Sequence, residues 1–133
     1  MVIGSFGSVS LDPPLVMFLP AKSSSSWPAI QETGHFAVSV LGAHQGEVCH
    51  TVFEKGQDPF AMFEWHTLST GSPVLRDCLA WLDCRIADVH EAGDHWIVVG
   101  EVVALGEGDP EGGPLVFWGG AYGTIGDLPR PLT

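Results

Sequence analysis

A lysine followed by four serines, residues 22–26, is the stretch of this sequence whose residue types best suit the binding of an anion. A short helix is predicted directly after it, over residues 27–33, because Ser26 suits the N-cap, Pro28 the first turn and Gly34 the position after the last turn. Serine hydroxyls, the N–H groups of a helix N-terminus and one ammonium group are the donors that a phosphate group needs. A solvated serine loop that only caps the helix is compatible with the same spacing.

The second candidate is the sequence Gly93-Asp94-His95, at the expected start of a strand over residues 95–105. Adjacent residues of a strand point to opposite faces, so no direct contact between Asp94 and His95 is expected. A histidine that faces a pocket donates a hydrogen bond or a proton near neutral pH. A turn followed by a surface histidine is the alternative interpretation.

Metal binding and nucleophilic catalysis find little support in the sequence. The cysteines Cys49, Cys78 and Cys84 are odd in number and lack the C-x-x-C spacing of zinc sites. Each is therefore predicted to be a packed core thiol, and no metal site is expected. No Gly-x-Ser-x-Gly nucleophile elbow, GxGxxG loop or Walker A sequence is present.

The composition limits the classes of partner. The chain has 133 residues and a mass of 14.2 kDa, which suits one domain over residues 1–133. Its 16 acidic residues and 5 Lys or Arg residues give a net charge of -11, so neither nucleic acid nor an anionic membrane is an expected partner. No apolar stretch approaches the ~20 residues that cross a bilayer and no signal peptide is recognised, so the cytoplasm is the expected compartment.

Short apolar segments between Gly- and Pro-rich turns predict a mainly β domain. Alternating residue types over residues 80–87 predict a strand with Asp83 on its wetter face, and Gly100 is expected at a bulge. Residues 54–73 are expected to be rich in loops. The pattern is typical of a small antiparallel barrel with two peripheral helices. The expected elements are strands over residues 1–11, 15–19, 36–41, 80–87, 95–105 and 114–118, and helices over residues 27–33 and 43–53.

Several separated segments agree in order and spacing with one known family. The chain resembles the flavin reductase-like, FMN-binding split-barrel family, whose members are reductase components of two-component flavin-dependent monooxygenases. The resemblance implies a mainly β, antiparallel Greek-key split β-barrel with two short peripheral helices. It is carried by residues 5–16, 22–30, 34–41, 79–84, 91–95 and 114–118.

The resemblance also implies the site. It implies hydride transfer from NADH or NADPH to FMN or FAD, a homodimer, and a partner monooxygenase that receives reduced flavin by diffusion. His95 is the implied catalytic residue, and Asp94, His95 and Tyr122 are implied to bind the nicotinamide. The residues implied to bind the flavin are Gly4, Ser5, Phe6, Ser8, Pro20, Ala21, Lys22, Ser23, Ser24, Ser25 and Ser26.

The sequence departs from the family pattern at several positions. Val2 and Gly4 stand where members usually carry polar residues, and Val52 stands where many carry Arg. Residues 119–122 lack the basic residues that members often have near the end. Compared with the family, the usual N-terminal helix and hairpin are also expected to be missing. These differences favour an alternative function: a non-catalytic split-barrel module that binds flavin or another ligand, or an inactive partner subunit.

Overall fold

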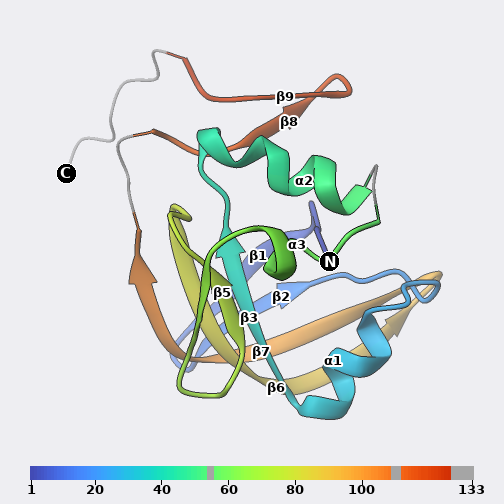
Figure 1. Cartoon of the computed structure of the whole chain (residues 1–133). Helices are drawn as coiled ribbons and strands as arrows, with labels where there is room; N and C mark the ends of the chain where they lie inside the picture. Colours follow the sequence, from blue (N-terminus) through green and yellow to red (C-terminus); the bar gives the residue numbers. More distant parts are fainter. Residues whose placement is uncertain (54–55, 109–111, 127–133) are drawn as a thin grey trace.

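One antiparallel sheet of five strands organises the computed structural model, which describes residues 1–53, 56–108 and 112–126 (Figure 1). The strands lie in the order β1-β2-β7-β6-β3, and each pairs antiparallel with its neighbours. The two longest, β6 and β7, form a hairpin whose turn contains Gly93, at a positive φ of 60° that glycine adopts without strain. The bounds are β1 Phe6–Leu11, β2 Pro14–Phe18, β3 His35–Val40, β6 Ala80–Ala92 and β7 His95–Glu107.

Short helices and two small hairpins surround this sheet. The helix α2 lies beside the β8–β9 hairpin in Figure 1, at the opposite end of the molecule from α1. The β4–β5 and β8–β9 pairs are separate two-stranded sheets. The bounds are α1 Trp27–Thr33, the 3-10 helix η1 Ala43–Gln45, α2 Gly46–Phe53, α3 Pro59–Met62, β4 Trp65–Thr67, β5 Pro73–Leu75, β8 Val116–Trp118 and β9 Ala121–Gly123.

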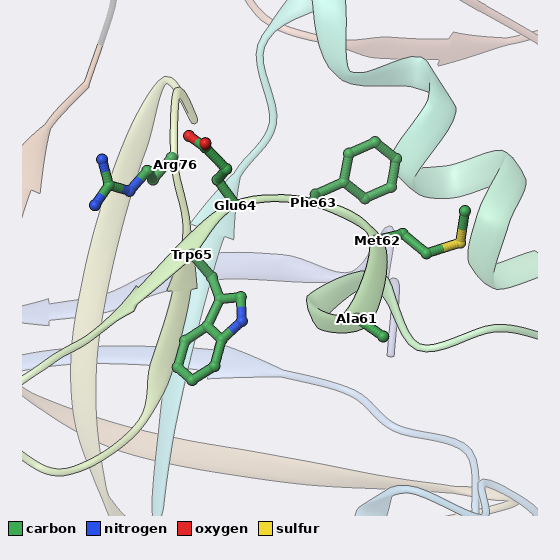
Figure 2. Close-up of a pocket in the computed structure, with 6 residues that line it drawn as sticks. All are labelled: Ala61, Met62, Phe63, Glu64, Trp65 and Arg76. Atoms are coloured by element: carbon green, nitrogen blue, oxygen red, sulfur yellow. The ribbon is translucent and has the colours of Figure 1, made fainter.

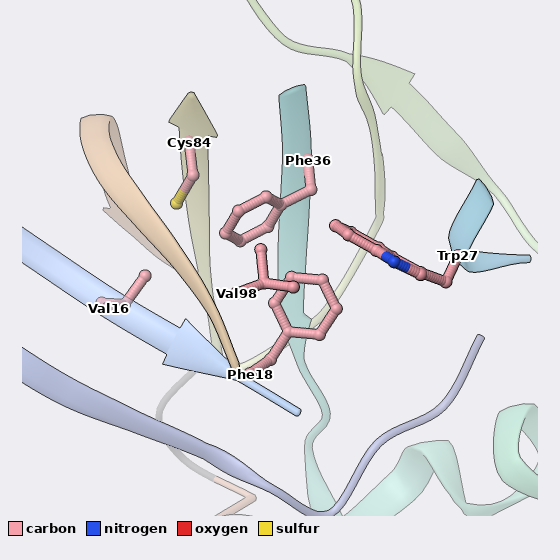
Figure 3. Close-up of a cluster of buried hydrophobic side chains, with 6 residues drawn as sticks. All are labelled: Val16, Phe18, Trp27, Phe36, Cys84 and Val98. Atoms are coloured by element: carbon pink, nitrogen blue, oxygen red, sulfur yellow. The ribbon is translucent and has the colours of Figure 1, made fainter. Parts of the chain in front are cut away.

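The core packs one face of the sheet against α1, and it is built around three aromatic rings (Figure 3). The ring of Phe18 meets Phe36 and Trp27 edge to face, with centroids 4.8 Å and 5.8 Å away. Val16, Cys84 and Val98 complete the buried cluster. Aromatic pairs in this geometry stabilise a core beyond the area that they bury.

Gly100 serves the packing of this core. A Cβ atom at Gly100 would lie 2.4 Å from Cζ of Phe36 and 3.2 Å from Cβ of Cys84, so only glycine lets the Phe36 ring approach β7 this closely. The register of β6 with β7 shifts between Ile86 and Asp88, whereas Gly100 keeps its pairing with Ile86. The irregularity therefore lies directly beside the predicted position, and its extra residue, Ala87, is on β6 rather than on β7.

The antiparallel, mainly β prediction is confirmed, and the helix count is corrected. Helix α1 has the predicted bounds and ends at Gly34 in the left-handed region. The described residues contain three α-helices instead of two, since α3 lies within the stretch that was expected to be rich in loops, together with β4 and the first residue of β5. The predicted second helix begins as η1 and becomes α-helical at Gly46.

The sheet is open on one side in the described part of the chain. Its edge strands, β1 and β3, both contribute to the lining of one cavity of about 1420 Å³. Met1 and Ile3 contribute from the N-terminal segment, and α2 and the β8–β9 hairpin contribute Phe53 and Phe117. The two edges of the sheet therefore face a common space, which we call the open cavity.

Candidate functional site

Two of the predicted binding segments lie side by side although some 70 residues of sequence separate them. The N–H group of Lys22 donates to the carbonyl oxygen of Asp94 at 2.8 Å, and that of Trp96 donates to Pro20 at 2.9 Å. Ala21 and His95 form an antiparallel bridge between these bonds. We call residues 20–26 and 93–96 the paired loops. Backbone hydrogen bonds thus hold the candidate phosphate loop against the candidate nicotinamide turn.

The Lys22 ammonium group contacts residues near the end of β6 and the start of β7. It forms an ion pair with the carboxylate of Glu91, near the end of β6, and it lies 5.0 Å from the centroid of the Trp96 ring. The hydrogen bond from Lys22, together with its positive charge, lowers the pKa of Glu91 below its usual value. Lys22 is thus a localised positive charge in a strongly acidic protein.

Asp94 and His95 are in direct contact, which contradicts the expectation that they point apart. Oδ1 of Asp94 lies 2.7 Å from Nδ1 of His95. The strand rule does not apply because β7 begins at His95, so that Asp94 belongs to the turn. The hydrogen bond with His95, and then its charge, lower the pKa of Asp94. A ring held through Nδ1 presents Nε2 to a ligand.

Within the serine loop, Ser24 rather than Ser26 caps α1. The hydroxyl oxygen of Ser24 accepts hydrogen bonds from the N–H groups of Ser26 and Trp27, each at 3.3 Å, whereas the Ser26 side chain makes no capping bond. The backbone of Ser26 is already helical, so its hydroxyl does not reach back to the first turn. Ser23, Ser25 and Ser26 are exposed, which leaves their hydroxyl groups accessible to an anion.

The predicted flavin residues in and just before β1 are divided between different environments. Gly4 and Phe6 line the open cavity. Ser5 turns toward β2, where its hydroxyl donates to the carbonyl oxygen of Leu19 at 3.3 Å. Ser8 is exposed on β1 and pairs with Val16.

Tyr122, on β9, lines the open cavity together with Gly4, Phe6 and Ser26. Its ring packs against Phe117 with centroids 5.1 Å apart. The described lining of the open cavity includes neither Asp94 nor His95. The structure therefore places Tyr122 with the predicted flavin residues, and its predicted contact with the nicotinamide stays a prediction.

Most of the open cavity is formed by residues that the sequence did not suggest. Its apolar wall comes from β3, and its polar groups include Ser39, Thr70 and Ser72. A large apolar space with a few polar groups suits an aromatic ring system. No local sequence signal marks these residues, because they come from separate elements that meet only in the folded chain. The one shared cue was the apolar strand predicted over residues 36–41.

A second, smaller pocket of about 480 Å³ lies over the β4–β5 hairpin and α3 (Figure 2). The backbone N–H of Arg76 donates to the carbonyl oxygen of Glu64 at 2.9 Å there. Its described lining contains none of the predicted site residues: it consists of Ala61, Met62, Phe63, Glu64, Trp65 and Arg76. We therefore assign the candidate site to the paired loops and the open cavity.

The cysteines are buried free thiols, as predicted. Burial, followed by the charge of Asp83, raises the pKa of Cys84 to about 12. A thiol with such a pKa is protonated at neutral pH and does not act as a nucleophile. Among the described residues, no group of three or more His, Cys, Asp or Glu side chains is arranged to hold a metal ion. None of the helices in the described ranges is long and apolar enough to cross a membrane.

The fold and the paired loops together define a small antiparallel β protein with a candidate site for a phosphorylated ligand. The chain belongs to the flavin reductase like domain family, which matches residues 1–126. Over 123 residues it is 46% identical to a flavin reductase of Pseudomonas putida and 48% identical to the FMN reductase (NADH) SmoA of Agrobacterium fabrum. These matches cover 92% of this chain and 72% and 69% of the two relatives.

A solved structure extends the likeness to three dimensions. The chain superimposes on nitrilotriacetate monooxygenase component B from Mycobacterium thermoresistibile with a TM-score of 0.89 and 40% identity. The match covers 98% of this chain and 75% of that one. The mainly β fold and the family implied by the sequence are both confirmed.

Proposed function

We propose that this chain is an NAD(P)H:flavin oxidoreductase, which reduces FMN or FAD with NADH or NADPH and supplies the reduced flavin to a partner monooxygenase. The observation that carries the proposal is the pairing of Pro20 and Lys22 with Asp94 and Trp96. It holds the candidate phosphate loop beside the candidate nicotinamide turn. The names of the relatives, an NADH-dependent FMN reductase and a monooxygenase component among them, support the same reaction.

The residues present fit a phosphorylated flavin. The Lys22 ammonium and the exposed hydroxyls of Ser23, Ser25 and Ser26 are suitable donors to its phosphate, and Gly4 and Phe6 border the apolar space that suits its ring. When bound, the flavin supplies the hydride acceptor. The protein's part is to bind and orient the two ligands, and His95, fixed by Asp94, is suited to hydrogen-bond the nicotinamide.

The test is to mix the purified protein with NADH and either FMN or FAD, and to follow the absorbance of NADH. We expect NADH to be consumed only when flavin is present. Arg76→Gln serves as a control, because it removes a positive charge from the smaller pocket and leaves the paired loops intact. A protein that consumes no NADH with either flavin would overturn the proposed function.

A second function is favoured by one observation, namely that the open cavity and the paired loops share Ser26 but not His95. A chain that holds flavin in the cavity without bringing the nicotinamide to it would be a flavin-binding module, or an inactive partner subunit. Retention of a yellow flavin without oxidation of NADH distinguishes this function from the reductase.

We further propose that the chain works as a homodimer. Several large apolar side chains are exposed, and apolar surface of this kind favours burial against a second subunit. The measurement is the molar mass in solution by light scattering, and a monomer at the working concentration would contradict this assembly. The exposed side chains concerned are Leu11, Leu105, Phe117 and Trp118.

We propose the cytoplasm as the compartment. Three free thiols suit a reducing environment, and the proposed reaction draws on NADH or NADPH. Fractionation of cells that make the protein tests this location.

A further inference from the structure

The ammonium group of Lys22 already has an anionic partner in this structure. Glu91 provides it from the end of β6, where the carboxylate forms the ion pair described above. Asp94 carries a second carboxylate near Lys22, whose charge contributes to the low pKa of Asp94. The ammonium also lies over the ring of Trp96 on β7, and the imidazole of His95 contacts the carboxylate of Asp94. A phosphate that binds to Lys22 therefore meets two carboxylates in its immediate surroundings.

We propose that Glu91 sets the preference of the flavin site between phosphorylated and unphosphorylated flavins, by competing with the phosphate group for Lys22. The inference rests on the proposed function, because it assigns the Lys22 region to the flavin phosphate. Glu91 acts through Lys22 and is a specificity-determining residue in this sense, without touching the reacting atoms.

The backbone of Lys22 is held independently of Glu91. Its backbone N–H is held by the carbonyl oxygen of Asp94 at 2.8 Å, and its ammonium contacts the Trp96 ring from another side. Neutralising Glu91 therefore removes the competing partner and keeps the backbone bond and the Trp96 contact of Lys22 available. Glutamine preserves the shape of the side chain, so Glu91→Gln isolates the charge.

Competition of this kind affects only a ligand that carries an anionic group. A phosphate that takes over the ammonium either displaces the Glu91 carboxylate or shares Lys22 with it, and sharing brings two anions together. Riboflavin has the same ring system but no phosphate, so it gains nothing from the release of Lys22. The ratio of FMN affinity to riboflavin affinity is therefore the quantity that Glu91 controls.

The effect is modest because the ion pair is largely open to solvent, with the Glu91 side chain 68% exposed. Exposed pairs of this type correspond to a change in affinity of at most about fivefold. We expect Glu91→Gln to strengthen FMN binding about two- to fivefold at low ionic strength and to leave riboflavin binding unchanged. Added salt reduces the gain, because it screens exposed charges.

Asp88 on the same strand provides a matched control. Its carboxylate is similarly exposed at 61%, and it pairs with Nε2 of His90 at 3.1 Å rather than with Lys22. Asp88→Asn changes the net charge by the same amount as Glu91→Gln. It is expected to leave the preference between FMN and riboflavin unchanged.

The experiment measures the dissociation constants of FMN and riboflavin by flavin fluorescence, for the wild type, both single variants and the double variant Lys22→Gln/Glu91→Gln with its Lys22→Gln parent. The expected result is a gain for FMN in Glu91→Gln that disappears when Lys22 is replaced. Weaker FMN binding in Glu91→Gln, no change, the same gain for riboflavin, or the same gain in Asp88→Asn would each overturn the inference. A wild type that binds neither flavin would overturn the proposed function itself, and the inference with it.

Discussion

Two tryptophans mark two regions of this molecule that differ in how their side chains are packed. Trp27, the first residue of α1, is 3% exposed and packs edge to face against Phe18. Trp118, on the β8–β9 hairpin, is 85% exposed. The first region also contains the paired loops, and the second borders the open cavity. Figure 1 shows α1 and the β8–β9 hairpin at opposite ends of the molecule.

The difference shows that the two halves of the candidate site are held in different ways. Around Trp27 the chain supplies its own core, so backbone hydrogen bonds keep Lys22 and Asp94 in fixed positions. Around Trp118 the apolar side chains face outward, and they gain most from a second surface that covers them. The proposed phosphate end of the candidate site is therefore formed within one chain, whereas the proposed ring end is the part that the proposed dimer would complete.

Replacing each tryptophan by alanine tests the difference in packing between the two regions, and it has the largest expected effect. Trp27→Ala is expected to lower the free energy of unfolding by about 3–5 kcal/mol, because it empties a packed core site. Trp118→Ala is expected to change it by less than about 0.5 kcal/mol, as surface substitutions do. Denaturant unfolding of the monomeric protein at low concentration measures both values.

Trp27→Phe keeps the comparison testable if the alanine variant does not fold, since it retains an aromatic ring and creates a smaller cavity. An intermediate loss of stability is expected for it. Equal losses for Trp27→Ala and Trp118→Ala would contradict the distinction between the two regions.

The local parts of the packed region could be read from the sequence. Pro28 and Gly34 defined α1 to the residue, and β7 begins at His95 as predicted, because these signals act within a few residues. The contact of Asp94 with His95 was missed, since the rule for adjacent strand residues was applied to Asp94, which lies in the turn before β7.

Asp83 shows why the remainder could not be predicted. Alternation placed it on the wetter face of its strand, yet it is fully buried. Its carboxylate accepts hydrogen bonds from the Ser69 hydroxyl at 3.1 Å and from the Thr70 N–H at 3.3 Å. These partners come from the turn between β4 and β5, a hairpin that was predicted as loop. The burial of Asp83 thus depends on residues 13 and 14 positions away in the sequence. The open cavity likewise forms from segments that are far apart in the sequence.

After the tryptophan replacements, Lys22→Ala is expected to have the next largest effect, which is on the binding of FMN by the packed region. We expect FMN affinity to fall about five- to tenfold, because a hydrogen bond to a charged group at an exposed site contributes about 1–1.4 kcal/mol. Arg76→Gln, which removes the same charge from the smaller pocket, is expected to leave FMN affinity almost unchanged. Titration of flavin fluorescence measures both. Equal losses would assign the effect to net charge rather than to the paired loops.

His95→Ala tests whether the two paired loops bind different ligands, the flavin and the nicotinamide. The KM for NADH is expected to rise several-fold at saturating FMN, while the dissociation constant of FMN changes by less than about twofold. Asp94→Asn is expected to raise the KM for NADH by a smaller factor, because it only loosens the ring through Nδ1. Steady-state kinetics give the KM values and flavin titration gives the affinities. A loss of FMN affinity as large as the change in KM would place His95 at the flavin instead.

The smallest expected effect concerns pH and the ion pair between Lys22 and Glu91. The pKa of Glu91 is lowered in the folded protein, so the pair stabilises the fold above the usual Glu value of 4.5 and the stabilisation is lost as the pH falls through the lower, folded value. Wild type is therefore expected to melt slightly above Glu91→Gln near pH 6, and the difference is expected to shrink as the pH falls below 4.5. Asp88→Asn is the comparison variant on the same strand. A difference that grows on acidification would reverse the sign required by the pair. If the Glu91 ion pair both stabilises the fold and competes with the phosphate for Lys22, then the same interaction raises the stability of the packed region and lowers its affinity for FMN.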